Sequence, residues 1–262
     1  MRVLFVGDVF GRPGRKAVSQ YLRELKAKHL VDVCIINGEN AAHGKGITHE
    51  IAKQFFLLGA DVITLGNHAW DNKDIFNFIH TEERLIRPYN FPPGLPGKGY
   101  VKFHLRNGQK VTVAQLCCRL FMTPIDCPFV GADKMIEEVG SDHPIIVDIH
   151  GEATSEKIAL AWYLDGRVSA VVGTHTHIPT ADERILPKGT AYITDVGMTG
   201  SYNSVIGMDL ELAIERFKTT MRKPYKIAED NVKLLAVLIS INDETGQADS
   251  IQRISLDFID EE

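Results

Sequence analysis

Several common signals are missing from this 262-residue sequence, and each absence narrows the possible classes of protein. Only four cysteines occur, at positions 34, 117, 118 and 127, and none of them forms a C-x-x-C pair. This spacing does not indicate a disulfide framework or a thiolate zinc site, and it is typical of reduced thiols in the cytoplasm. No run approaches the ~20 apolar residues that span a bilayer, and no apolar signal-peptide stretch follows the first residue. We therefore expect a cytoplasmic protein without membrane contact.

Positively charged residues are also fewer than negatively charged ones. The chain has 29 Lys and Arg residues against 34 Asp and Glu residues, which gives a formal net charge of −5. A protein that holds a long nucleic acid by its phosphates needs a basic face, so this balance argues against such a partner. A small nucleotide needs only local positive charge and remains compatible. The apolar fraction of 44% is that of an ordinary globular protein, and the length suits one domain over 1–262.

Strand-like and helix-like segments alternate in the first half of the chain. Strands are expected at 2–7, 33–36, 62–65, 110–116, 144–149, 168–172 and 191–194, and helices at about 12–28, 48–58, 72–79 and 154–165. Thr48 and Thr154 are expected N-caps, and Gly59 is expected to end the second helix. Residues 86–99 and 117–135 are expected to be irregular, and 260–262 a solvated tail. Two final strands, 232–241 and 250–258, flank a hairpin-like turn. This order predicts a mixed α/β (α+β) fold with helices outside the sheets.

Side chains of a restricted kind follow five of the expected strands. They are Asp8, then Glu39 and Asn40, then Asn67 and His68, then His150, and finally His175 and His177. The carboxyl ends of the strands in an open α/β sheet share one edge, where ligands bind. Imidazole suits transition metals, whereas carboxylate and amide oxygens suit harder cations. A mixed set of this size exceeds what one tetrahedral zinc uses and suits two cations ~3.5–4 Å apart that share a carboxylate.

The H-x-H pair in the last of these segments has a geometric use. Residues two apart in an extended segment point to the same side. We therefore expect His175 and His177 to serve one metal each.

In this order the motifs resemble those of the calcineurin-like metallophosphoesterases, and in particular the YmdB-like family of cyclic-nucleotide phosphodiesterases. The resemblance is nearly full-length and includes GENAAHGKGIT at 38–48, GNHAWD at 66–71 and TDVGMTG at 194–200. It implies a four-layer αββα metallophosphoesterase sandwich, in which helices flank two mixed β-sheets in a single domain over 1–262.

Two departures from the wider superfamily concern the metal ligands. Phe10 stands where that superfamily has a histidine, and Glu39 stands where it has an aspartate. The YmdB-like resemblance implies that the amide oxygen of Asn40 replaces the missing ligand. One metal would then be held by Asp8, Glu39, Asn40 and His177, and the other by Glu39, Asn67, His150 and His175. The loss of an imidazole makes the first site richer in oxygen, which favours iron, with manganese as the alternative.

The resemblance also implies a reaction. A hydroxide that bridges two metals would attack phosphorus in a small cyclic nucleotide, either 2′,3′ or 3′,5′, and His68 would assist the leaving oxygen as general acid. The alternative is a regulatory protein that binds a nucleotide and signals through a partner with weak turnover, and measured turnover after metal reconstitution separates the two. A homo-oligomer is compatible with either.

Two other classes of site do not fit the sequence. A serine esterase of the G-D-S type is excluded by Val9, which occupies the nucleophile position. The spacing of Gly7, Gly11 and Gly14 matches neither a Rossmann nor a P-loop site. Four histidines lie outside any constellation and are interpreted as surface residues: His29, His80, His104 and His143.

Overall fold

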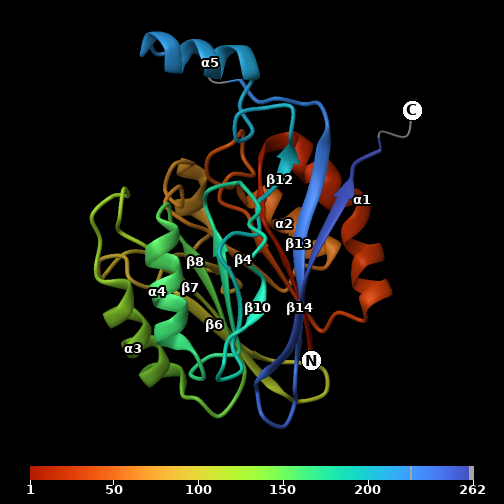
Figure 1. Cartoon of the computed structure of the whole chain (residues 1–262), viewed down its shortest axis with the longest axis vertical. Helices are drawn as coiled ribbons and strands as arrows, with labels where there is room; N and C mark the ends of the chain where they lie inside the picture. The colour runs from red at the N-terminus through yellow and green to blue at the C-terminus, as the bar shows by residue number, and fades with distance from the viewer. Residues whose placement is uncertain (225, 260–262) are drawn as a thin grey trace.

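Two mixed β-sheets packed face to face form the centre of the computed structural model, which describes residues 1–224 and 226–259 (Figure 1). The first sheet contains β1 (Arg2–Val6), β2 (Asp8–Val9), β3 (Val33–Asn37), β4 (Val62–Thr64), β5 (Leu85–Ile86), β12 (Met198–Ser201), β13 (Val232–Ile241) and β14 (Ala248–Asp257). Its order is β2-β12-β13-β1-β3-β4-β5, and β14 pairs with β13. The second sheet has the order β10-β11-β9-β8-β7-β6. Its strands are β6 (Tyr100–His104), β7 (Lys110–Cys117), β8 (Ile145–His150), β9 (Ala170–Thr174), β10 (Arg184–Ile185) and β11 (Ala191–Ile193).

The parallel strands of both sheets place their carboxyl ends at one edge of the molecule. In the first sheet β1, β3, β4 and β5 are parallel, and β13 is antiparallel to β1. In the second sheet β7, β8, β9 and β11 are parallel. All five residues of β3 are buried, as expected for a strand covered on both faces.

Helices cover the outer face of each sheet. α1 (Gly11–His29), α2 (His49–Leu58) and the 3₁₀ helix Lys73–Asn77 belong to the side of the first sheet, and α3 (Pro128–Val139) and α4 (Thr154–Leu164) cover the second. Figure 1 shows α3 and α4 on one side of the sheets and α1 on the other. α5 (Leu210–Thr219) stands apart from these layers. Among the described residues, no helix is long and apolar enough to cross a membrane.

Alternation along the strands builds separate apolar cores. Leu4 and Val6 of β1 point to the core under α1 and α2, whereas Val3 and Phe5 point to the core between the sheets. This is the two-residue period of a strand, applied to a sheet that is buried on both faces. A third core lies between the second sheet and helices α3 and α4, where Leu160 is fully buried. Three cores separate four layers, which confirms the αββα arrangement expected from the sequence.

The local signals for helix ends were partly correct. Thr48 caps α2 by accepting a hydrogen bond from the amide of Ile51 (3.3 Å), and Gly59 ends the helix with φ of 109°. The prediction for Thr154 is wrong, because Ala153 is the N-cap of α4 and Thr154 is its first helical residue. The segment 117–135 is not wholly irregular, since α3 begins at Pro128, a residue whose fixed φ suits a first helical turn. The expected helix at 72–79 is a shorter 3₁₀ helix. The expected tail at 260–262 lies outside the described residues.

Candidate metal centre

The structure brings the side chains that follow the five predicted strands to one buried edge. Asp8, Glu39 and His150 are fully buried, and Asn40 and His177 are at most 7% exposed. The three ligand atoms offered by Glu39, His150 and His175 all lie within 4.8 Å of one another. These residues come from three different strand ends, β3, β8 and β9, so their proximity results from the sheet topology rather than from local sequence.

Nε2 of His150 is the centre of this cluster. It lies 3.1 Å from Oε1 of Glu39, 2.8 Å from Oδ1 of Asn67 and 3.0 Å from Nδ1 of His175. The other ring nitrogen, Nδ1, lies 2.9 Å from the hydroxyl of Thr174, which donates its own proton to Asp148 (2.7 Å). Because that hydroxyl is already a donor, Nδ1 of His150 carries a proton, and Nε2 faces the three neighbouring atoms.

That arrangement of neighbours fits a cation. Burial alone would lower the pKa of His150, but attraction to Glu39 and Asp8 outweighs it and raises the pKa to about 9. A second proton, on Nε2, could be donated to only one of the three neighbouring atoms, which belong to Glu39, Asn67 and His175. A metal ion satisfies all of these atoms at once, and a ring whose Nδ1 donates to an oxygen is typical of metal-binding histidines.

The second half of the cluster lies around His177. Its Nε2 is 3.2 Å from the side-chain nitrogen Nδ2 of Asn40. The same Nδ2 is 3.1 Å from Oε1 of Glu39. Oδ2 of Asp8 accepts a hydrogen bond from the backbone amide of His175 (3.2 Å), and Oδ1 of Asp8 is buried without a hydrogen-bond partner among the described residues. Such an orphaned carboxylate oxygen is a position where a cation fits. The amide of Asn40 would have to turn over, exchanging nitrogen and oxygen, to act as a ligand.

The pKa values of the cluster reflect uncompensated charge in a buried space. Burial raises the pKa of Asp8 well above its usual value. Burial also opposes ionisation of Glu39, yet its attraction and hydrogen bond to His150 bring its pKa below the usual value. Burial and the neighbouring His150 lower the pKa of His175 to about 3. Opposite shifts among neighbouring groups are typical of a functional site.

The backbone between the last two histidines differs from the extended form expected. His175 has φ of 101° and His177 has φ of 66°, so both occupy a region that costs non-glycine residues about 1–3 kcal/mol each. The expectation that both rings reach the same cluster is nevertheless met, since His175 contacts His150 and His177 contacts Asn40.

A fully buried ion pair holds this strained segment. Nζ of Lys157 in α4 lies 2.8 Å from Oδ2 of Asp195 and donates to the carbonyl of Thr174 (2.6 Å), directly before His175. The same Oδ2 of Asp195 accepts from the amide of Thr176 (3.0 Å), directly after it. Both side chains are 0% exposed.

Two further residues shape the cluster. A Cβ at position 66 would collide with Oε2 of Glu39 and Nε2 of His150, so only glycine permits this approach. Phe10, which replaces a superfamily histidine, is buried, and its ring meets the ring of His177 edge-on at 5.4 Å between centroids. Phe10 therefore packs against one of the expected ligands instead of joining them.

His68 lies at the rim of the cluster. Its backbone amide donates to Oε2 of Glu39 (3.1 Å), and its Nδ1 lies 2.8 Å from Oδ2 of Asp71. The side chain is 26% exposed, unlike that of His150. This leaves Nε2 of His68 available to a molecule that approaches the cluster from solvent.

Sequence reasoning missed four carboxylates that support the site: Asp71, Asp148, Glu152 and Asp195. Asp148 could have been noticed as an acidic residue inside an apolar strand. Asp195 directly follows the strand expected at 191–194, just as the predicted ligands follow their strands. Glu152 lies 3.1 Å from Nε2 of His175. No comparable signal points to Glu152.

Comparisons with known proteins show which proteins this chain resembles. A 2′,3′-cyclic-nucleotide 2′-phosphodiesterase of Bacillus subtilis (strain 168) is 55% identical over 257 residues, covering 97% of this chain and 96% of the relative. A hypothetical protein of Thermus thermophilus superposes with a TM-score of 0.93 at 44% identity, covering 98% of this chain and 99% of the other. A Mycoplasma pneumoniae protein described as a novel phosphatase has the same TM-score at 34% identity, covering 98% and 93%.

The match extends to the family level. The family described as YmdB-like protein matches residues 4–254, which is nearly the whole chain. The names of the relatives agree with the enzyme class expected from the sequence, a metallophosphoesterase. The resemblance inferred from the strand-end motifs is thereby confirmed, and the chain belongs to the YmdB-like protein family.

Proposed function

We propose that this protein is a dinuclear metal-dependent phosphodiesterase that hydrolyses small cyclic nucleotides. The observation that carries the proposal is the convergence of atoms from Glu39, Asn67 and His175 on Nε2 of the fully buried His150, an arrangement that a cation would satisfy. The Bacillus subtilis relative is named for 2′,3′-cyclic nucleotides, which makes these the first substrates to examine and the 3′,5′ isomers the second. The whole chain, 1–262, would act as one domain, and its four free cysteines favour the cytoplasm.

The ligand sets of the two metals follow the two halves of the cluster. Glu39 lies between them, since its Oε1 approaches both His150 and Asn40. We assign the first metal to Asp8, Glu39, Asn40 and His177, and the second to Glu39, Asn67, His150 and His175. Two such cations, when bound, supply Lewis-acid charge at the phosphate oxygens and lower the pKa of water at the site. The oxygen-rich first set favours iron, with manganese as the alternative.

His68 is assigned to the proton that the leaving oxygen needs. The carboxylate of Asp71 lies 2.8 Å from Nδ1 and orients the ring, so a proton delivered to the leaving oxygen would come from Nε2. Nε2 is the atom available on the solvent side of the cluster, where the leaving ribose oxygen of a cyclic nucleotide would depart. His68 would donate this proton as the phosphorus–oxygen bond breaks, and would take one back from water afterwards.

The test couples metal analysis to turnover. Purified protein is analysed for iron and manganese, then stripped with a chelator, reconstituted with each metal, and assayed on 2′,3′-cyclic AMP, 3′,5′-cyclic AMP and a simple phosphodiester. We expect two equivalents of metal and turnover that returns only with metal. His104→Ala, which alters an exposed histidine on β6, is the matched control and should behave as wild type.

Two results would refute the enzyme proposal. A folded protein that retains less than one equivalent of metal under all conditions would remove its physical basis. A metal-loaded protein that binds a cyclic nucleotide without hydrolysing it would instead support the regulatory alternative.

A further inference from the structure

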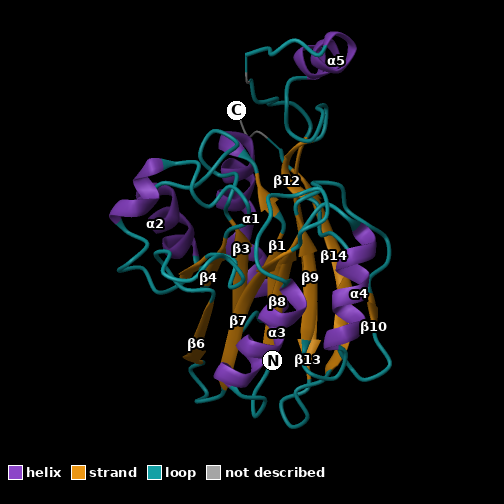
Figure 2. Ribbon diagram, turned by 90° about the vertical axis from the view of Figure 1, so that its left-hand side faces the viewer, coloured by secondary structure: helices purple, strands orange, loops and turns teal. Residues whose placement is uncertain are grey.

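A pocket of about 220 Å³ adjoins the candidate metal centre. Asn67 lines this pocket, and its Oδ1 lies 2.8 Å from Nε2 of His150 at the centre of the cluster. Cys117, at the end of β7, also lines the pocket and is paired in register with His150 of β8. Figure 2 shows loops at the upper end of the sheets, where β4 and β7 finish. A molecule bound at the cluster can therefore extend into this pocket.

The pocket differs from the cluster in its chemistry. The described residues that line it carry no formal charge. Most of them are apolar, and they include Trp70, Phe91, Leu95, Met122 and Ile125. An anionic phosphate is costly to bury in such surroundings, whereas a flat, uncharged ring gains by leaving water there. The volume is below the ~300–1,000 Å³ of pockets that enclose whole drug-sized ligands, so this pocket suits one part of a larger molecule.

Two aromatic rings of the lining are held in place by their neighbours. Trp70 stacks on Phe76, with 5.5 Å between centroids and 13° between planes, and Phe91 lies 6.1 Å from Trp70. Trp70 belongs to the same turn, 67–70, as Asn67, so one short loop serves both the cluster and the pocket. Rings that are fixed before a ligand arrives lose little conformational freedom when the ligand stacks on them.

A buried asparagine fixes the walls of the pocket. Asn90, 3% exposed, directly precedes Phe91. Its side-chain nitrogen donates to the carbonyls of Cys117 and Asp126 (2.8 Å each), and its Oδ1 accepts from the amide of Cys117 (2.9 Å). These bonds join the loop after β5 to the end of β7 and to the segment that carries Ile125. The shape of the pocket is therefore set by the fold.

We propose that this pocket binds the base of the cyclic nucleotide while the metal cluster holds its phosphate, an inference that rests on the function proposed above. The ribose would lie beside Asn67, which borders both. Stacking and apolar contact discriminate weakly among bases, because every base has an aromatic face. The protein should therefore accept both purine and pyrimidine nucleotides. Binding of the base, remote from the reacting phosphorus, contributes to kcat/KM.

The first test compares substrates with and without a base. The metal-loaded full chain is assayed on 2′,3′-cyclic AMP, 2′,3′-cyclic CMP and ribose 2′,3′-cyclic phosphate, which is the same diester without a base. Both nucleotides should have a kcat/KM ~10-fold or more above that of the base-free diester, the size expected for one base–aromatic stack.

Replacement of the tryptophan should affect only the substrates that have a base. Trp70→Ala should lower kcat/KM by ~5–100-fold on both nucleotides and by less than ~2-fold on the base-free diester. Trp70→Phe keeps an aromatic face and should recover most of the loss. Trp162→Ala removes the other tryptophan of the chain, from α4, and is the matched control that should behave as wild type. Circular dichroism of each variant checks that the fold is intact.

The fluorescence of Trp70 measures binding of the base without turnover. Trp162→Phe leaves Trp70 as the single tryptophan of the chain. Adenosine, which has a base and no phosphate, should quench the emission of Trp70 with saturation, and ribose should not. This titration uses an unaltered pocket, so it tests the proposal even if Trp70→Ala does not fold.

The outcomes distinguish this proposal from the proposed function. Similar kcat/KM values on all three substrates, or equal losses on all three in Trp70→Ala, would overturn the base pocket and leave the phosphodiesterase in place. Adenosine that quenches Trp70 no more than ribose does would also overturn it. Saturable quenching by adenosine in a protein that hydrolyses none of the substrates would support the base pocket and reject hydrolysis.

Discussion

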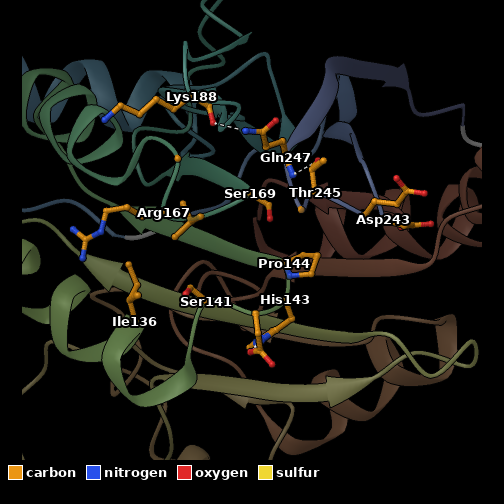
Figure 3. Close-up of a pocket in the computed structure, with 15 residues that line it drawn as sticks. Ile136, Ser141, His143, Pro144, Arg167, Ser169, Lys188, Asp243, Thr245 and Gln247 are labelled. Atoms are coloured by element: carbon orange, nitrogen blue, oxygen red, sulfur yellow. Dashed lines mark hydrogen bonds and ion pairs between the residues drawn. The ribbon is translucent and has the colours of Figure 1, made fainter.

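The two ends of the same strands, β8 and β9, differ in what surrounds their polar residues. At the amino ends lies a groove of about 610 Å³, lined by residues that include His143, Arg167, Lys188 and Gln247 (Figure 3). At the carboxyl ends lie His150 and the segment that carries His175. The carboxyl end, and not this groove, carries the candidate metal centre.

The difference lies in how the charges are satisfied. At the groove, Arg167 pairs with Asp133 (2.7 Å) while both remain more than a third exposed, and Lys188 and Gln247 are joined through a backbone carbonyl. The hydrogen bond from His143 holds the pKa of the exposed Asp142 below its usual value. At the carboxyl end, the groups are buried, their pKa values move in opposite directions, and Oδ1 of Asp8 has no hydrogen-bond partner among the described residues. In this chain the candidate site is therefore marked by buried, unsatisfied polar atoms and not by the groove.

The largest effect should follow removal of the central imidazole at the carboxyl end. His150→Ala deletes the nitrogen on which Glu39, Asn67 and His175 converge, so the second metal should be lost together with turnover. Elemental analysis and the phosphodiesterase assay measure both. Activity should fall to that of the chelated protein, and retention of both metals by a folded variant would contradict the ligand assignment.

Replacement of the rim histidine should separate turnover from metal binding. His68→Ala leaves the proposed ligands in place and removes the proton donor, so kcat should fall by ~10²–10⁴-fold with metal content unchanged. A substrate with a good leaving group should suffer less, because its leaving oxygen needs no proton. Equal losses on both substrates would argue that His68 acts in another way.

The buried ion pair at the carboxyl end should matter for stability even without metal. Lys157→Met leaves Asp195 charged and unpaired in the interior, which should lower the free energy of unfolding by about 3–5 kcal/mol. Urea denaturation of the metal-free protein measures this. Lys98→Met breaks an exposed pair with Glu83 and is the control, with little change expected.

The double variant sharpens the same test. Lys157→Met with Asp195→Asn removes both charges and should be less destabilised than the sum of the single variants. Because the pair holds the backbone on both sides of His175, metal affinity should fall in all three variants. Unchanged affinity would show that the pair stabilises the fold without positioning the ligand.

Much of the carboxyl end could be predicted from the sequence, for a physical reason. Parallel strands are apolar runs, and their carboxyl ends meet at one edge, so the residue after each run is placed without knowledge of the tertiary structure. Asp8, Glu39, His150 and His175 were found in this way. Asp195 follows an expected strand in the same way and was overlooked, whereas Lys157 of α4 acts through a contact between distant elements that no local pattern indicates.

Other features depend on tertiary contacts that no local pattern encodes. The backbone at His175 and His177 has positive φ instead of the extended form. The prediction that both side chains reach one cluster therefore rested on a backbone geometry that the structure does not have. His143 was interpreted as a surface residue, but its side chain is only 2% exposed and lies 2.7 Å from the hydroxyl of Thr112. The sequence analysis made no prediction for α5, although Leu210, Ala213, Ile214 and Phe217 have helical spacing.

Thiol reactivity should show how well the interior excludes solvent, both at Cys34 in β3 and at Cys118 near the carboxyl end. Burial disfavours the charged thiolate, which raises the pKa of Cys34 to about 12 and that of Cys118 to about 12. Both should stay protonated and unreactive from neutral pH to well above pH 9, whereas the half-buried Cys127 should react first. A thiol-reactive chromophore should thus label one thiol rapidly in the native protein and four in denaturant. Fast reaction of Cys118 at neutral pH would indicate that this end is open.

The smallest effect should come from the groove at the amino ends. Arg167→Ala and Lys188→Ala remove its positive charges, which lie at the opposite end of β8 and β9 from His150. If unsatisfied buried groups rather than concavity define the site, both variants should keep kcat/KM within ~2-fold of wild type, as expected for surface changes. The comparison is sharp because groove and cluster share the same strands, so a distortion of the sheet would affect both. A tenfold loss of kcat/KM in the Lys188 variant with an intact fold would mean that the groove contributes to activity.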